Sequence, residues 1–153
     1  MAMPRRSLVV LLLAALAALV ALVAPPAPGA RAATAAYLVI VNSENPVKEV
    51  SADFLRDAFL KKASSWASGE ALRPVDLTRR FPAREAFTHD VLRKTLPQLK
   101  RYWNQQIFSG KGVPPPELDS EKAVIAYVIA NKGAVAYLPA GTEVAGVKVV
   151  KVK

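Results

Sequence analysis

Residues 75–87, VDLTRRFPAREAF, concentrate the side chains of this chain that are best suited to bind an anion. Arg79, Arg80 and Arg84 surround a proline whose fixed φ is favourable at the first position of a helix. Guanidinium groups present planar forks of N–H donors, and the amino end of a helix carries a partial positive charge. Together with the hydroxyl of Thr78, these groups could hold a small oxyanion.

The same stretch has a second interpretation that needs no ligand. A proline often begins a helix, and arginines in the preceding turn can simply be solvated. The sequence therefore leaves two possibilities open. One is an anion site built from Thr78, Arg79, Arg80 and Arg84, and the other is a basic turn that leads into a helix.

Few other residues suggest catalysis or metal binding. His89 is the only histidine, and on a helix Glu85 and Arg93 would lie four residues before and after it, which is the pattern of a charged surface. The chain has no cysteine, which excludes disulfides, a thiolate nucleophile and a lipid-modified cysteine. No glycine-rich phosphate loop follows a predicted strand. We therefore expect a non-catalytic protein without a metal or cofactor.

The first 35 residues have the pattern of a secretory signal peptide. Arg5 and Arg6 precede sixteen apolar residues at 8–23, and small residues at A-x-A spacing follow near position 31. An uncleaved anchor is the alternative, but the apolar run is shorter than the ~20 residues that a membrane span needs. We predict a cleaved signal peptide at 1–35 and a periplasmic or secreted domain at 36–153. The exported protein would not be a lipoprotein and would keep no stable membrane span.

The charge of the exported part favours anionic partners. The leader carries Arg5, Arg6 and Arg31, so removing it leaves 21 − 3 = 18 Lys and Arg against 12 Asp and Glu, a net charge of 18 − 12 = +6. Such an excess favours small anions, anionic surfaces or acidic proteins, and export makes a nucleic-acid partner unexpected. The remaining 153 − 35 = 118 residues are the size of one domain.

Strands and helices alternate along these residues. A continuous apolar, β-branched run at 37–41 predicts a strand that is covered on both faces. Pro74 places a second strand at an edge of the sheet or makes it irregular. Trp103 shares a helix face with core residues, whereas the place of Trp66 stays open. Helices are expected from Ser51 to about 61, around 87–92, over 96–107 and from Ser120 to a left-handed stop at Gly133, with strands at 72–77, 134–138 and 147–152. This order predicts an α/β fold: a single three-layer domain with a mixed sheet between helical layers.

Two long segments suggest a family. VIVNSENPVKEVSADFLRDAFLKKASSW resembles the V-N-P, helix, F-L-G-K and W pattern of phosphate ABC transporter substrate-binding proteins, which are type 2 periplasmic binding proteins. LKRYWNQQIFSGKGVPPPE and VIAYVIANKGAVAYLP resemble the Y-W, F-x-G-x-G and P-G-A-I-G-Y-V segments of their single-lobe relatives. The resemblance covers residues 39–139 and implies the fold of one lobe.

The resemblance also implies where an anion would bind, and there the chain departs from the family. The family has a Ser-Gly-Thr turn at the start of the helix that follows the second strand, where hydroxyls and backbone N–H groups bind the oxyanion. Here the matching positions are Phe81, Pro82 and Ala83, which have no hydroxyl. The family's glycine in F-L-G-K is Lys61, and the proline and second glycine of P-G-A-I-G-Y-V are Lys132 and Ala136.

Two functions follow as expectations. The first is non-catalytic binding of phosphate or a related small oxyanion, linked to transport or sensing, with Thr78, Arg79, Arg80 and Arg84 as the ligand-binding residues. The second is an envelope interaction module that keeps the fold and has lost the ligand. Because one lobe leaves a bound anion half exposed to water, either function favours an envelope protein partner or a self-dimer.

Overall fold

The computed structural model describes residues 36–153, and the predicted leader lies outside the described residues. Five strands form one sheet in the order β2-β7-β1-β6-β3, and two further short strands, β4 and β5, pair with each other. The strands are β1 (Tyr37–Asn42), β2 (Glu49–Val50), β3 (Arg73–Pro74), β4 (Asp76–Leu77), β5 (Glu117–Leu118), β6 (Ala134–Pro139) and β7 (Val147–Val152). The helices are α2 (Ala52–Phe59), α3 (Pro82–Asp90), α4 (Leu96–Phe108) and α5 (Glu121–Ala130).

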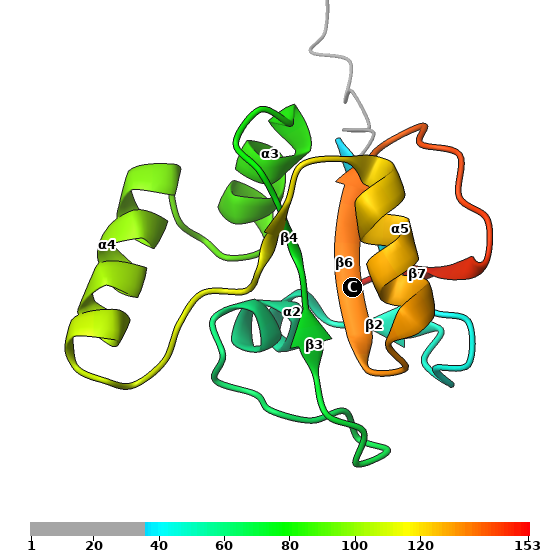
Figure 1. Ribbon diagram of the computed structural model, residues 1–153, viewed down its shortest axis with the longest axis horizontal. Coiled ribbons are helices and arrows are strands. Elements are labelled where there is room, and N and C mark those ends of the chain that lie inside the picture. Colours follow the sequence, from blue (N-terminus) through cyan, green and yellow to red (C-terminus); the bar gives the residue numbers. More distant parts are fainter. Residues whose placement is uncertain (1–35) are drawn as a thin grey trace, which may run out of the picture. The chain divides into compact units, whose positions relative to one another are not determined.

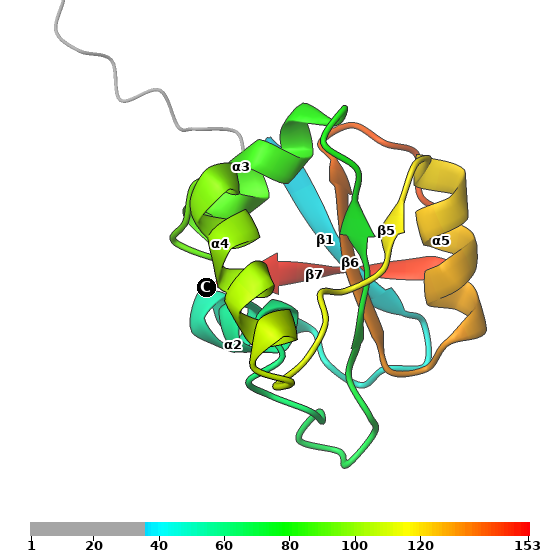
Figure 2. The same cartoon turned by 60° about the vertical axis from the view of Figure 1, so that its left-hand side comes forward.

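The sheet is mixed and lies between two layers of helices, as predicted. β1 is antiparallel to both of its neighbours, β6 and β7, whereas β2 is parallel to β7 and β3 is parallel to β6. Helix α5 lies on one side of the sheet, and α2, α3 and α4 lie on the other (Figures 1 and 2). The α/β three-layer prediction is confirmed.

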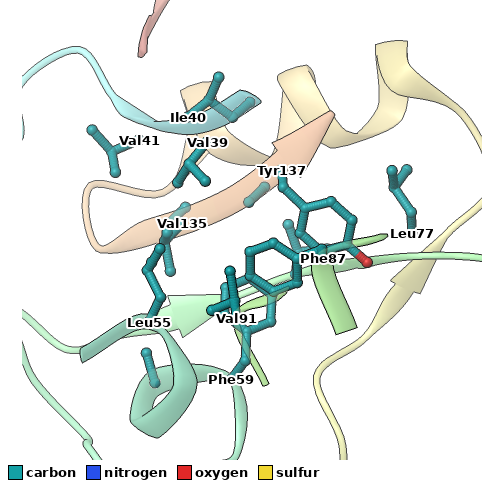
Figure 3. Packing of buried hydrophobic residues seen from close by; sticks show 14 of the residues in the cluster. Val39, Ile40, Val41, Leu55, Phe59, Leu77, Phe87, Val91, Val135 and Tyr137 are labelled. Atoms are coloured by element: carbon teal, nitrogen blue, oxygen red, sulfur yellow. The ribbon is translucent and has the colours of Figure 1, made fainter. Parts of the chain in front are cut away.

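The core is formed where β1 and β6 meet the helices. Val39, Ile40 and Val41 of β1 are buried and β-branched, and β6 is buried and apolar from Ala134 to Leu138, which suits a sheet covered on both faces. Tyr137 of β6 stacks on Phe87 of α3, with ring centroids 4.0 Å apart, and Phe59 of α2 lies 4.8 Å from Phe87 (Figure 3). These three rings join β6 to the helical layer that contains the arginines.

Side-chain caps determine where three of the helices begin. Ser51 accepts a hydrogen bond from the backbone of Phe54 and starts α2, and Ser120 accepts one from Ala123 and starts α5. Thr95 and Gln98 form a reciprocal capping box at α4. The Ser51 and Ser120 caps confirm the sequence prediction.

The predicted strand at 72–77 divides into two strands. Pro74 cannot donate a hydrogen bond, and β3 lies at the edge of the five-stranded sheet, as predicted. The N–H of Val75 still donates to Val135 of β6, but the N–H of Asp76 donates to Pro116, next to β5. The chain thus leaves the main sheet at Asp76, and this change of partner directs the following arginines toward α4 and β5.

Three local predictions are resolved by the structure. The left-handed stop at Gly133 is wrong, because its φ is not positive. Glycine is required there for space, since a Cβ would lie 1.8 Å from the carbonyl oxygen of Ala71. Lys61, which replaces the family's glycine, does have a left-handed φ of 58°. Trp66 is buried and donates to the carbonyl of Gly133 at 3.0 Å, and Trp103 is buried as predicted.

Candidate anion-binding site

The segment from Thr78 to Arg84, called the arginine loop below, contains the turn between β4 and α3 and the first three residues of α3. Its first residue is held by β5, because the N–H of Thr78 donates to Leu118 at 3.0 Å. The N–H of Phe81 then donates back to the carbonyl of Thr78, which closes a turn before Pro82 begins α3. The proline is therefore at the start of a helix, as the sequence predicted.

Arg84 is a buried structural residue rather than a free cation. Its side chain is 7% exposed, and its guanidinium lies 2.6 Å from a carboxylate oxygen of Asp76 and 2.9 Å from one of Glu117. It also donates to the carbonyl of Leu77 at 2.5 Å. Three acceptors from β4 and β5 thus hold one cation at the first turn of α3, and they join the two short strands to the helix.

Asp76 is the buried partner in this cluster. It accepts hydrogen bonds from the Tyr137 hydroxyl and from the backbone of Leu77. Burial raises the pKa of Asp76 to about 6, although the neighbouring Arg84 opposes this shift. Burial alone would lower the pKa of Arg84, but Asp76 and Glu117 outweigh that effect and raise it. Burial and the charge of Asp76 also raise the pKa of Tyr137.

The other predicted site residues lie apart from this cluster. Arg80 is exposed, donates to the backbone carbonyl of Asp119, and lies 5.2 Å from the centroid of the Phe81 ring. Arg79 is exposed and borders a groove described below. The hydroxyl oxygen of Thr78 is buried and, among the described residues, has no hydrogen-bond partner. The structure therefore does not gather the four predicted residues around one point.

The amino end of α3 offers few donors to an anion. Phe81, the N-cap residue, provides no side-chain hydrogen bond, and Pro82 has no N–H. The N–H of Arg84 donates to the carbonyl of Phe81 at 2.9 Å, and Ala83 is buried. The loss of the Ser-Gly-Thr turn seen in the sequence is thus a loss of available donors, and an anion here would depend on side chains.

A groove of about 180 Å³ lies between the arginine loop, α4 and the segment that leads to β5. We call it the α4 groove. Arg79 and Lys100 are its exposed cations, and the buried Arg84 also lines it. The remaining lining residues are Leu96, Leu99, Trp103, Asn104, Ile107, Pro114 and Glu117.

Sequence reasoning found one of the groove's two exposed cations and missed the other. Arg79 stood out because it lies in a cluster of arginines before a helix. Lys100 is on α4, where the hydrophobic pattern of Leu99, Trp103 and Ile107 predicts a buried face. Nothing in that pattern indicates that the lysine next to it lines a binding site. Only the packing of α4 beside the arginine loop places Lys100 on the same groove as Arg79.

Nothing in the described residues suggests a metal centre. His89 is exposed, and its ring lies 2.9 Å from the carboxylate of Asp90. Across residues 36–153, no group of three or more His, Asp or Glu side chains is arranged to hold a metal ion. In the same part of the chain, no helix combines the length and apolar character needed to cross a bilayer.

The sequence matches no protein-family model and none of the curated proteins. The fold does match solved structures. One is a protein of Clostridium perfringens described as a phosphate ABC transporter substrate-binding protein with bound phosphate, with TM-score 0.60, 19% identity, and coverage of 76% of this chain and 44% of that one. The chain has the fold of one lobe of a phosphate transporter substrate-binding protein.

A second solved structure agrees with this assignment. It is an ABC-type phosphate transport receptor from Vibrio cholerae, with TM-score 0.58, 16% identity, and coverage of 76% of this chain and 46% of that one. This chain therefore spans less than half the length of either protein. At sequence identities below 20%, the similarity establishes the fold and does not establish the ligand.

Proposed function

We propose that this chain is an exported, non-catalytic protein that binds a small oxyanion in the α4 groove, in solute uptake or sensing. The observation that carries the proposal is the meeting of Arg79 and Lys100 at one groove, beside the buried guanidinium of Arg84. Arg79 and Lys100 are exposed and therefore accessible to an anion, and opposite charges attract each other in the groove that the two side chains share.

The structural neighbours support the same class of ligand. The solved protein of Clostridium perfringens holds phosphate, and the receptor of Vibrio cholerae is named for phosphate transport. The predicted net charge of +6 for the exported part favours anions as well. Of the residues predicted from the sequence, we retain Arg79 as a direct ligand and assign Arg84 to the support of the groove. Thr78 and Arg80 remain candidates at the edge of the loop.

A titration tests this function directly. Phosphate and sulfate are titrated into the purified protein by calorimetry, and the experiment is repeated with Arg79→Ala and Lys100→Ala. We expect saturable binding that each substitution weakens at least tenfold. Lys122→Ala, on α5 at the other side of the sheet, is the matched control and should leave binding unchanged. Absence of binding by phosphate, sulfate and the carboxylate considered below would reject the function.

An envelope interaction module is the second candidate, and one surface favours it. Phe108 at the end of α4 is 96% exposed, and Ile107 and Val113 nearby are 52% and 65% exposed. Exposed apolar groups of this size are common where a protein contacts a partner. A single lobe that also needs a partner to enclose its ligand would combine both functions. Substitution Phe108→Ser should then abolish partner binding without changing anion binding.

A further inference from the structure

The α4 groove is half apolar, which is unusual for a site that would bind a fully hydrated inorganic anion. Five of its ten lining residues are apolar: Leu96, Leu99, Trp103, Ile107 and Pro114. Leu99 and Trp103 are mostly buried and present only a small part of their surface to the groove, whereas Ile107 is 52% exposed. Apolar walls gain free energy by covering apolar ligand surface and gain nothing from covering phosphate oxygens.

The charges of the groove match an anion with a single charge. Arg79, Lys100 and Arg84 contribute three positive charges. Glu117 lines the groove, and Asp76 lies 2.6 Å from the Arg84 guanidinium, so two negative charges offset them and 3 − 2 = +1 remains. A phosphate dianion would bring an excess negative charge close to Glu117, whereas a monocarboxylate would not.

The donors also suit a carboxylate. A carboxylate is planar and has two oxygens, which an arginine fork and one ammonium group can satisfy. A phosphate needs donors around a tetrahedron, and the start of α3 supplies few, because Pro82 has no N–H and the N–H of Arg84 is already bonded. Asn104 adds a neutral amide at the edge of the groove.

The volume limits the size of the ligand. At about 30 Å³ for each water molecule in the liquid, a groove of about 180 Å³ has the volume of roughly six waters. That space accommodates a short aliphatic chain or one aromatic ring, together with its carboxylate.

We propose that the α4 groove binds small organic monocarboxylates, with the carboxylate between Arg79 and Lys100 and an apolar body against Trp103 and Ile107. This inference rests on the proposed anion-binding function and specifies its ligand class. The cations Arg79 and Lys100, the polar rim of the groove, would bind the carboxylate of the ligand. Trp103 and Ile107, the apolar wall, would contact its apolar body.

Nuclear magnetic resonance provides the test, with benzoate as the probe. The indole N–H signal of Trp103 reports on the groove, and that of Trp66, which is hydrogen-bonded to Gly133 in the core, is an internal control. Benzoate should shift the Trp103 signal saturably and leave the Trp66 signal in place. Benzamide, which has the same ring without the charge, should bind at least tenfold more weakly.

Two variants test the polar rim and the apolar wall separately. Arg79→Ala should weaken benzoate binding at least tenfold, and so should Ile107→Ser, which is expected to fold because Ile107 is half exposed. Lys122→Ala should have no effect. Equal binding of benzoate and benzamide would overturn the inference, as would benzoate binding that Ile107→Ser leaves unchanged.

Inorganic phosphate forms a separate arm of the experiment. If phosphate binds with dependence on Arg79 while benzoate does not bind, the monocarboxylate inference is overturned and the proposed anion-binding function stands. If neither anion binds, both are overturned. Benzoate binding at least tenfold tighter than that of phosphate is the expected result.

Discussion

Replacing Arg84 by methionine should destabilise the protein strongly at neutral pH. Methionine keeps much of the side-chain length but removes the cation that lies 2.6 Å from Asp76 and 2.9 Å from Glu117. Asp76 is 5% exposed, so its charge would stay buried without a cation beside it. Removing one partner of a buried ion pair costs about 3–5 kcal/mol. A domain of this size has a total stability of about 5–15 kcal/mol, so the loss is a large fraction of it.

The pH dependence of the loss identifies its cause. Without Arg84 the pKa of Asp76 should rise above its present value of about 6, because the main opposing charge is gone. At pH 4.5 the carboxyl of the variant would then be protonated and neutral, and less than half of the loss at pH 7.5 should remain. Urea unfolding at the two pH values measures this difference directly.

Two further variants complete the experiment. Arg80→Met removes an exposed arginine of the same loop and should cost less than about 1 kcal/mol. In the double variant Asp76→Asn/Arg84→Met no buried charge remains unpaired at position 76. The double variant should therefore lose less stability than the sum of the losses in the two single variants. A loss below about 1 kcal/mol for Arg84→Met at pH 7.5, or an equal loss at both pH values, would refute the role of the buried ion pair.

Three other predictions concern the fold. Because the folded pKa of Asp76 is about 6 and its ordinary value is 3.8, the native state binds the proton more tightly. The contribution of this group to stability should therefore fall by about 2 kcal/mol as the pH rises from 4 to 6, and Asp76→Asn should remove that slope in urea unfolding. Lys61→Gly should stabilise the protein by about 0.5–1 kcal/mol in thermal unfolding, since glycine adopts a left-handed φ without steric cost, and a loss would argue against the 58° angle. Gly133→Ala should destabilise by more than about 2 kcal/mol, because its Cβ would meet the carbonyl of Ala71, and an unchanged melting temperature would contradict that close approach.

The sequence was sufficient to predict the longer elements of the fold. The apolar run of β1, the apolar run of β6, the valine-rich pattern of β7 and the caps at Ser51 and Ser120 are local signals, and the structure confirms them. The strands β2 and β5 were missed, because each has two residues and exists only through a partner distant in sequence. No local pattern marks such a strand.

The site was predicted less completely, and the three arginines show why. Arg79, Arg80 and Arg84 look alike in sequence, yet the first borders a groove, the second bonds a backbone carbonyl, and the third is buried. Arg84 is the buried one because it pairs with Asp76 of β4 and with Glu117 of β5, which is 33 residues from Arg84 in the sequence. The sequence left an anion site and a basic turn as alternatives for this loop. In the structure, the three arginines of the loop have three different surroundings.

The most direct test of the central claim is thermal unfolding of the protein with increasing concentrations of phosphate or benzoate, beside the same series with Arg79→Ala. Ionic strength is held constant with chloride. A ligand that binds only the native state raises its stability, by about 2.7 kcal/mol at one hundred times Kd. We expect a saturable rise in melting temperature with at least one of the two anions, and we expect Arg79→Ala to abolish it. No rise, or the same rise in both proteins, would contradict the central claim.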